Sequence, residues 1–236
     1  MRQYFVSGSL ETGKPHELTL QQSHHICDVL RMKNGDQIRV VDDDSRVFST
    51  LLRIEEGKAF IVPEKQIETE QNENEVILCA AMIKKEKWEL IIQKACELGA
   101  TTIVPLITER TIIKLDQKET ARKLDRYNKI ALEACQQSNR NRIVKVMEPI
   151  RLKDIGKYER STNFVCYEKE RNTLISDLDL KQSCCFAIGP EGGFTPAEID
   201  FLISRGFSSV SLGNDILRAE TACFYGLSVI KAIRSM

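Results

Sequence analysis

The residues best suited to surround a small ligand lie in the segment Gly189–Gly193, which reads Gly-Pro-Glu-Gly-Gly. It follows the apolar run Cys184–Ile188, which predicts a buried strand. Thr195, Pro196 and Glu198 come next, and their spacing is typical of a helix N-terminus with a capping box. Glycines in such a turn remove side chains and let a ligand reach the main chain. A plain strand-to-helix turn needs fewer glycines, so the composition favours a binding loop.

The carboxylate of Glu191 limits which ligands suit this loop. A negative side chain in the turn repels phosphate and favours a cationic or amine-bearing ligand. The chain also contains neither a G-x-G-x-x-G nor a G-K-[ST] sequence. An enzyme that hydrolyses nucleotides with this loop is therefore disfavoured.

A second candidate segment, Ser211–Ala222, also contains a predicted strand end with a glycine, Gly213. Ile216 and Leu217 are apolar residues in a predicted loop, so we expect them to pack on the core or to wall an apolar ligand such as an adenine ring. Arg218 opens the last predicted helix, where the helix dipole disfavours a cation. We therefore expect Arg218 to have a dedicated partner.

Two other polar segments have ordinary explanations. Gln136–Arg140 ends a predicted long helix, where a cation and hydrogen-bonding groups are common. His24 and His25 precede a predicted apolar helix without acidic or Cys partners nearby, and we interpret them as capping or packing residues rather than metal ligands. The eight cysteines form no C-x-x-C pair and mostly lie in apolar runs, so we expect structural thiols and no metal.

The elements that must position these segments change in character along the chain. Residues 1 to about 70 contain short strands with close turns, which suggest a small β-barrel. The polar stretch Glu64–Glu75 predicts a linker. The predicted elements of this part are strands at Gln3–Val6, Gln37–Val41, Val47–Ile54 and Lys58–Val62, and a helix at Ser23–Leu30.

From Val76 onward, predicted strands alternate with predicted helices. Apolar residues at helical spacing between Trp88 and Leu98, with Gly99 as a C-cap, predict the first of these helices. The alternation implies a mostly parallel sheet covered by helices on both faces. The predicted strands are Val76–Met82, Thr101–Leu106, Ile143–Met147, Asn163–Tyr167, Cys184–Gly189 and Ser208–Gly213, and the later helices are Glu119–Ser138 and Arg218–Arg234.

Composition and charge narrow the class of protein. Of 236 residues, 42% are hydrophobic and 29% charged, values typical of a globular protein. No apolar run approaches the roughly 20 residues of a membrane span, and the N-terminus lacks the apolar core of a secretion signal, so we expect a cytoplasmic location without a membrane. The net charge is zero, yet residues 110–160 contain 14 basic and 7 acidic side chains, a net of +7. Such a stretch is suited to a phosphate backbone, and a solvated helix face is an equal alternative.

With these segments in view, the sequence closely resembles the RsmE family of ribosomal RNA small-subunit uridine-N3 methyltransferases, within the SPOUT class. The resemblance covers nearly the whole chain. Its most specific motifs are IGPEGGFTPAE and SLGNDILRAETA, which are residues 188–198 and 211–222. The other matching segments are MRQYFV, HHICDVLRMKNGD, KKEKWELIIQKACELGATTIVPLITER and EACQQSNR.

The resemblance implies a fold, a substrate and a cofactor. We expect a PUA-like RNA-binding β-barrel over residues 1–70 and a SPOUT α/β domain over residues 73–236, whose C-terminal segment forms a deep trefoil knot. The resemblance further implies a homodimer that acts on 16S rRNA or the small ribosomal subunit, with S-adenosylmethionine in the knot. Matched motif by motif, the residues of the donor pocket are Gly189, Glu191, Gly192, Gly193, Leu212, Gly213, Ile216, Leu217 and Arg218. The residues that we assign to RNA binding are Arg2, Arg31, Arg110, Arg140 and Arg142.

Methylation of uridine N3 requires alignment, a stabilised anion and a proton acceptor. A cation beside the ring carbonyls would stabilise the imide anion, and we assign this role to Arg218. We assign the proton acceptor to Glu220, with Glu191 as its rival, and expect Arg140 to hold the RNA or the imide. The chain departs from the family pattern at Asp215, where a basic residue is common, and at Gln136, which replaces a common Glu and cannot act as a base.

Two alternative functions are compatible with the residues. One is methylation of another rRNA base or of a ribose 2′-hydroxyl. The other is a non-catalytic RNA-binding protein of ribosome assembly, although a pure binder does not need a glycine-lined pocket.

Overall fold

The protein is described by a computed structural model that covers residues 2–69, 74–111 and 117–235. The chain divides into two compact units. The first contains Met1–Gln71 together with Cys135–Arg142, and the second contains Asn72–Ala134 and Ile143–Met236. The assignment of Cys135–Arg142 to the first unit was not predicted, because local sequence carries no signal for a contact this distant along the chain.

The first unit is built on a five-stranded curled sheet in the order β1-β3-β4-β5-β2. Strands β3, β4, β5 and β2 pair antiparallel, whereas β1 pairs parallel with β3. Alternating side chains of β3 and β4 point into a core around Ile38, Val40 and Leu52. The strand bounds are β1 (Gln3–Phe5), β2 (His16–Glu17), β3 (Gln37–Val41), β4 (Val47–Glu55) and β5 (Lys58–Ile67). The predicted small barrel is confirmed in this half-barrel form, and the short strand β2 was not predicted.

The prediction of a linker at Glu64–Glu75 is wrong for its first residues. Strand β5 continues to Ile67 and pairs with β4 across a β-bulge between Ser49 and Thr50. Lys65 and Gln66 pair with Ser49 and Phe48 through their main chain, and their exposed polar side chains did not reveal the strand. The middle of the predicted linker, residues 70–73, lies outside the described residues.

The helix of the first unit begins earlier than predicted. Helix α1 (Leu20–His24) starts at Thr19, whose side chain forms a capping box with Gln22, and a π-helix (His25–Val29) follows it. Of the two histidines, His25 contacts the Tyr4 hydroxyl at 3.0 Å through Nδ1, which agrees with a packing role. His24 Nδ1 lies 2.6 Å from an acidic partner, Asp28, which corrects the expectation that no such partner is near.

The second unit contains the predicted parallel sheet. Its order is β12-β10-β11-β6-β7-β8, with β9 also on β7, and every pairing is parallel. The strands are β6 (Val76–Ala81), β7 (Thr102–Ile107), β8 (Lys145–Val146), β9 (Ile150–Arg151), β10 (Thr162–Cys166), β11 (Cys184–Ile188) and β12 (Ser208–Val210). The helices are α2 (Lys85–Leu98), α3 (Gln117–Gln137), α4 (Pro196–Ser204) and α5 (Ala219–Arg234), with 3₁₀ helices at Leu152–Tyr158 and Ile175–Asp177. Strand β9 and both 3₁₀ helices were not predicted.

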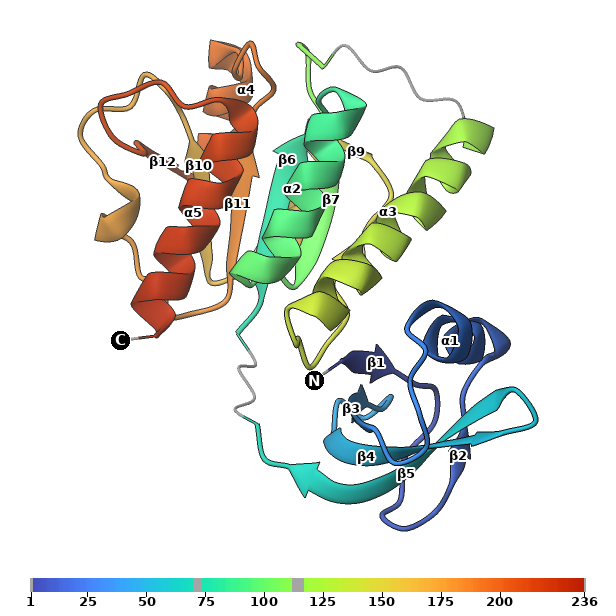
Figure 1. Cartoon of the computed structure of the whole chain (residues 1–236). Helices are drawn as coiled ribbons and strands as arrows, with labels where there is room; N and C mark the ends of the chain where they lie inside the picture. The colour runs from blue at the N-terminus through green and yellow to red at the C-terminus, as the bar shows by residue number, and fades with distance from the viewer. Residues whose placement is uncertain (1, 70–73, 112–116, 236) are drawn as a thin grey trace. The chain divides into compact units, whose positions relative to one another are not determined.

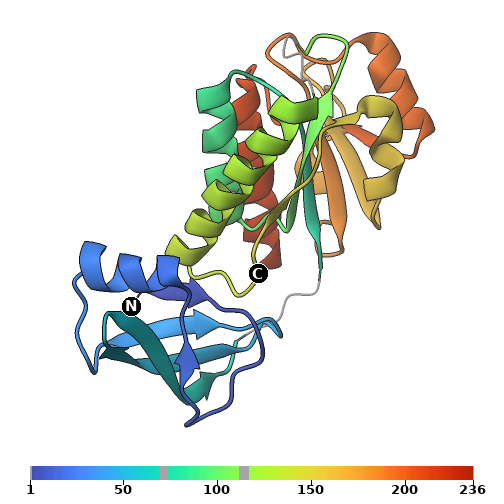
Figure 2. The same ribbon diagram turned by 90° about the vertical axis from the view of Figure 1, so that its right-hand side faces the viewer.

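Helices cover both faces of this sheet, as predicted. Figures 1 and 2 show α2 and α5 side by side on one face and α4 with the 3₁₀ helix Leu152–Tyr158 on the other. Strands β6 and β11 lie centrally and are buried along their whole length, which explains their continuous apolar sequences. The trefoil knot stays a prediction of the family resemblance.

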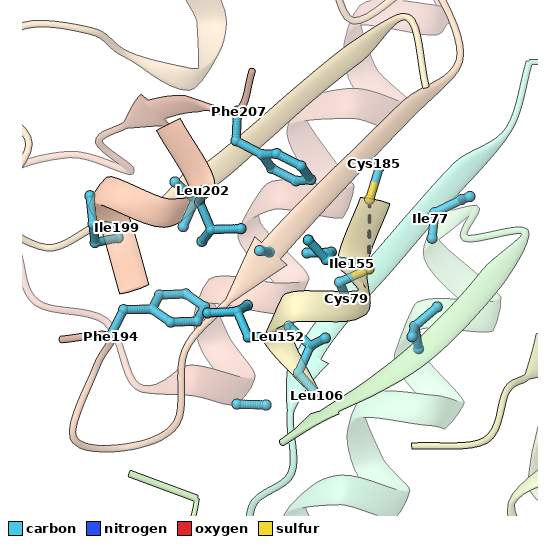
Figure 3. Close-up of a cluster of buried hydrophobic side chains, with 14 residues drawn as sticks. Ile77, Cys79, Leu106, Leu152, Ile155, Cys185, Phe194, Ile199, Leu202 and Phe207 are labelled. Carbon is cyan, nitrogen blue, oxygen red and sulfur yellow. Dashed lines mark hydrogen bonds between the residues drawn. The ribbon is translucent and has the colours of Figure 1, made fainter. Parts of the chain in front are cut away.

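Cysteines form part of the core of the second unit. Figure 3 shows Cys79 and Cys185 on neighbouring strands, with their Sγ atoms 3.6 Å apart among aliphatic and aromatic side chains. Burial raises the pKa of the Cys79 thiol well above its ordinary value. All eight cysteines are free thiols, and six of them are buried. A neutral, buried thiol behaves as a small apolar side chain, in agreement with the predicted structural role.

Candidate functional site

A cavity of about 350 Å³ lies at the carboxyl ends of β10, β11 and β12. Three segments line it: residues 166–168 with Arg171, residues 188–194, and residues 211–219 with Ala222. The volume lies within the roughly 300–1,000 Å³ of sites for small molecules. All nine residues that the sequence assigns to the donor pocket are among its lining, namely Gly189, Glu191, Gly192, Gly193, Leu212, Gly213, Ile216, Leu217 and Arg218.

Strand order brings these segments together. Strand β10 pairs with both β11 and β12, and all three run parallel, so their carboxyl ends meet at one edge of the sheet. Phe164 of β10 lies opposite Phe186 on one side and Ser208 on the other. The two glycine-containing loops therefore flank the end of β10.

The first loop, Gly189–Thr195, is shaped by the protein's own atoms. A Cβ at Gly189 would lie 3.1 Å from the backbone of Gly193 and Phe194, and one at Gly192 would lie 3.3 Å from Cδ of Arg110. A Cβ at Gly193, where φ is +69°, would lie 3.0 Å from the Glu168 carboxylate. The expectation that these glycines are needed for a ligand's approach is thus incomplete, because protein neighbours already occupy the space.

The end of the first loop is held by the predicted capping box of α4. The Thr195 side chain accepts from the Glu198 N–H, and Glu198 Oε2 accepts from the Thr195 N–H at 2.9 Å. The other oxygen of Glu198 accepts from the Glu109 N–H at 2.8 Å. One carboxylate therefore joins the start of α4 to the segment that follows β7.

The second loop, Ser211–Arg218, is held mainly at its start. Ser211 Oγ donates to the Gly213 carbonyl and accepts from the Gly213 N–H, at 3.0 and 3.2 Å. Ile216 lines the cavity but is 81% exposed, so it does not pack on the core. The Arg218 guanidinium makes no hydrogen bond or ion pair with the described residues, which corrects the expectation of a dedicated partner.

Glu220 is not among the residues that line the cavity. Its side chain is 12% exposed, and Oε1 lies 3.0 Å from Nζ of Lys87 on α2. Its other oxygen is buried and has no hydrogen-bond partner among the described residues. Burial alone would raise the pKa of this carboxyl, but hydrogen bonds from its own N–H and from Lys87, with the charges of Lys87 and Arg218, outweigh burial and lower the pKa.

Sequence reasoning missed the third wall of the cavity. Glu168 and Arg171 follow β10 and belong to the cavity lining. Arg171 donates to the carbonyls of Glu168 and Glu170 and so shapes its own turn. The charged run Glu168–Arg171 after a predicted strand was a usable signal, but its relevance depends on β10 lying between β11 and β12.

The residues that the sequence assigns to RNA binding fall in both units. Arg2, Arg31, Arg140 and Arg142 belong to the first unit, and the Arg140 carbonyl accepts from Gln3 Nε2 at 2.6 Å. Arg110 belongs to the second unit, where its guanidinium donates to the Gly192 carbonyl. Of these five, Arg110 is therefore the one that belongs to the unit containing the cavity. Other cations of the basic stretch form ion pairs: Lys123 with Glu119, Arg126 with Glu89, and Arg160 with Glu75.

Within the described part of the chain, no group of three or more His, Cys, Asp or Glu side chains is arranged to hold a metal ion. None of the helices in residues 2–69, 74–111 and 117–235 is both long and apolar enough to cross a membrane.

Comparison with known proteins places the chain in a family. Residues 70–231 match a family described as an RNA methyltransferase domain, and residues 18–64 match an RNA methyltransferase PUA domain. A Bacillus subtilis protein named ribosomal RNA small subunit methyltransferase E is 33% identical over 98% of this chain and 96% of its own length. The chain belongs to the ribosomal RNA small subunit methyltransferase E family. A Synechocystis member of this family is 35% identical over 92% of this chain and 72% of its own length.

Solved structures agree with this assignment to the methyltransferase E family. A Legionella pneumophila structure that contains S-adenosylmethionine as its cofactor is 30% identical, with a TM-score of 0.88 over 98% of this chain and 97% of that one. A Neisseria gonorrhoeae ribosomal RNA small subunit methyltransferase E bound to S-adenosylmethionine is 26% identical, with a TM-score of 0.90 over 99% of this chain and 98% of that one. The α/β methyltransferase fold and the PUA half-barrel are therefore features of the family.

Proposed function

We propose that this chain transfers a methyl group from S-adenosylmethionine to N3 of a specific uridine in 16S rRNA, and that it does so in the cytoplasm as a homodimer. The observation that carries the proposal is the single cavity lined by both family motifs, at the carboxyl edge of β10, β11 and β12. Two solved relatives hold S-adenosylmethionine, which supports assigning that ligand to the cavity.

The lining of the cavity fits this donor in charge and polarity. Glu168, Glu191 and Asp215 contribute three carboxylates, against the cations Arg171 and Arg218, so the ionisable lining carries a net charge of −1. S-adenosylmethionine has a sulfonium, an ammonium and one carboxylate, which complements that sign. Apolar side chains from the second loop, Leu212, Ile216 and Leu217, provide surfaces for an adenine ring.

The chain's own side chains would stabilise the uridine anion. The bound sulfonium supplies an activated methyl group, so the protein has to align the imide nitrogen with it. Loss of the N3 proton spreads negative charge over the ring carbonyls, and the unpaired guanidinium of Arg218 is suited to stabilise it. Arg140 remains our candidate for holding the RNA or the imide.

The geometry supports Glu191 better than Glu220 as the proton acceptor. Glu191 lines the cavity and is exposed, whereas Glu220 is engaged by Lys87 outside the lining. The lowered pKa also makes Glu220 a weaker base. Glu220 is then better explained as the residue that anchors the start of α5, next to Arg218.

Two measurements test the proposed function. Calorimetry with S-adenosylmethionine should detect stoichiometric binding to the full chain, and mass spectrometry of digested 16S rRNA from a deletion strain should show loss of one N3-methyluridine that the wild-type gene restores. Loss of a different methylated nucleotide would instead support another base or a ribose hydroxyl as the target. A chain that binds 16S rRNA but neither the donor nor its product would be a non-catalytic assembly protein.

RNA binding and assembly have separate tests. We propose that Arg2, Arg31, Arg140 and Arg142 contact RNA phosphates, so the affinity for a 16S rRNA transcript should fall as salt increases. A flat salt profile would contradict a phosphate-contacting surface. Sedimentation of the purified chain should give the mass of two copies, and the mass of one copy would contradict the homodimer.

A further inference from the structure

Arg110 has a defined contact that the proposed reaction does not use. It follows β7, and its guanidinium donates a hydrogen bond to the backbone carbonyl of Gly192 in the first cavity loop. The side chain is exposed, yet it is directed at a main-chain acceptor of the second unit. An arginine that serves only to attract RNA has no need of this contact.

The loop is shaped to receive this side chain. A Cβ at Gly192 would lie 3.3 Å from Cδ and 3.8 Å from Cβ of Arg110, so the glycine lets the arginine methylenes lie against the loop. Gly192 does not have a positive φ, unlike Gly193. The space taken by Arg110, rather than backbone conformation, therefore explains a glycine at position 192.

The residue before Arg110 makes a second connection to the same loop. The Glu109 N–H donates to Glu198 at 2.8 Å, and the same carboxylate accepts from the Thr195 N–H at 2.9 Å. The segment Glu109–Arg110 thus contacts the loop at Gly192 and at the start of α4. Two attachment points fix the course of the intervening Gly193 and Phe194 more closely than one would.

We infer that Arg110 is a positioning residue that holds the Gly192–Gly193 wall of the donor cavity, instead of a residue that contacts RNA phosphate. The inference rests on the proposed function only for its ligand. The hydrogen bond is charge-assisted, because a guanidinium donates it, and such bonds are stronger than neutral ones.

The first test measures donor binding to full-length variants by calorimetry. Arg110→Ala should raise the Kd for S-adenosylmethionine about tenfold, the loss expected for one charge-assisted hydrogen bond. The Kd for S-adenosylhomocysteine should rise by a similar factor, because a displaced wall affects both ligands. Arg110→Lys keeps a cation and a donor and should recover part of the affinity. Arg122→Ala removes an exposed cation of α3 and should leave both Kd values at the wild-type level.

A double-mutant cycle separates this contact from general damage. Gly192→Ala should weaken donor binding in the wild-type background, because its Cβ crowds Arg110. In the Arg110→Ala background, Gly192→Ala should raise the Kd for S-adenosylmethionine by a much smaller factor, since the crowded side chain is absent. An equal rise in Kd from Gly192→Ala in both backgrounds would overturn the inference.

The competing role predicts a different result with RNA. If Arg110 contacts phosphate, Arg110→Ala should lower the slope of log affinity for a 16S rRNA transcript against log salt by about 0.7–0.9 and leave donor affinity unchanged. That pair of results would overturn the inference. A raised donor Kd with an unchanged salt slope would support it.

Hydrogen exchange tests the contact without any donor. The Gly193 N–H donates to the Pro190 carbonyl at 2.8 Å, and this bond depends on the course of the loop. Arg110→Ala should speed exchange at Gly193 while leaving the amides of β11 protected. Failure of the wild type to bind S-adenosylmethionine would contradict the proposed function. Unchanged exchange at Gly193 in Arg110→Ala would contradict only the positioning role of Arg110.

Discussion

The two loops of the cavity differ in how they are held. Gly189–Thr195 is fixed by Arg110, by Glu168 beside Gly193 and by the capping box of α4. Ser211–Arg218 is anchored at Ser211, and from Gly213 to Ile216 it is exposed to solvent. The first loop is therefore formed before any ligand arrives, whereas the second keeps its side chains available.

This difference separates a rigid wall from an adaptable one. A preformed loop loses little conformational entropy on binding, and this favours affinity. A loop with few internal contacts loses more conformational entropy when it closes on a ligand. Its side chains without a hydrogen bond to the described residues, such as Arg218, are free to act on the substrate. Buried positions of the first loop, such as Phe194, should accordingly report mainly on stability, and exposed positions of the second loop, such as Ile216, on affinity and turnover.

The largest contrast is expected between the apolar side chains of the two loops. Phe194 is 2% exposed and packs in the core, so Phe194→Ala should lower the free energy of unfolding by about 3–5 kcal/mol. Ile216 is 81% exposed, so Ile216→Ala should change it by no more than about 0.5 kcal/mol while weakening donor binding. Urea unfolding and calorimetry measure both. Equal losses of stability in Phe194→Ala and Ile216→Ala would contradict the expected difference between the two loops.

Arg218 tests whether the second loop acts on the substrate. Because its guanidinium makes no hydrogen bond with the described residues and acts on Glu220 only through its charge, Arg218→Ala should change the melting temperature only slightly. Turnover should fall about hundredfold, the usual cost of removing a group that stabilises a developing anion. Single-turnover methylation of a 16S rRNA transcript measures it. A loss of stability without a loss of turnover would make Arg218 a structural residue.

The glycines of the two loops allow a matched comparison. Gly193 has φ of +69° and the Glu168 carboxylate 3.0 Å from its Cβ position, whereas Gly213 has φ of +120° and nothing within 4 Å. Alanine at either position should strain the backbone and lower the free energy of unfolding by about 1–3 kcal/mol. At Gly193 alone, crowding by the Glu168 carboxylate should lower it further. In a Glu168→Ala background that further cost should disappear. Thermal unfolding of the four variants provides the comparison.

The smallest expected effect is a pH dependence at the end of the second loop. The pKa of Glu220 is lowered in the folded state, so its contribution to stability is complete above the unfolded pKa of about 4.3 and is lost as pH falls through the folded value. The difference in free energy of unfolding between wild type and Glu220→Gln should therefore shrink as pH falls from 7 toward 3. Glu191→Gln, at an exposed position of the first loop, serves as the control. A difference that grew at low pH would contradict the Lys87 ion pair.

Much of the fold was predictable because its signals are local. Central strands such as Val76–Ala81 are apolar along their length, and the start of α4 is encoded by Thr195, Pro196 and Glu198 within four residues. Elements without such signals were missed. Strand β9 has two residues, and the exposed end of β5 has the composition of a linker.

The parts of the candidate site that have local sequence signals were also predictable. Both glycine-containing loops follow apolar strands, and all nine residues assigned to the donor pocket line one cavity. Glu168 and Arg110 could not be placed beside the first loop, because each follows a strand that is distant from this loop in sequence. The Lys87 partner of Glu220 was not predicted, since no local sequence pattern indicates a contact between these two residues.

By itself, the sequence determined where most of the longer strands and helices form, which two loops carry the glycines, and that a carboxylate and a cation accompany them, because spacing and side-chain chemistry act over a few residues. The tertiary structure alone decided that β10 lies between β11 and β12, and that Arg110 and Glu168 flank the first loop. These arrangements depend on strand order and on contacts between residues far apart in the chain, and no local pattern specifies either.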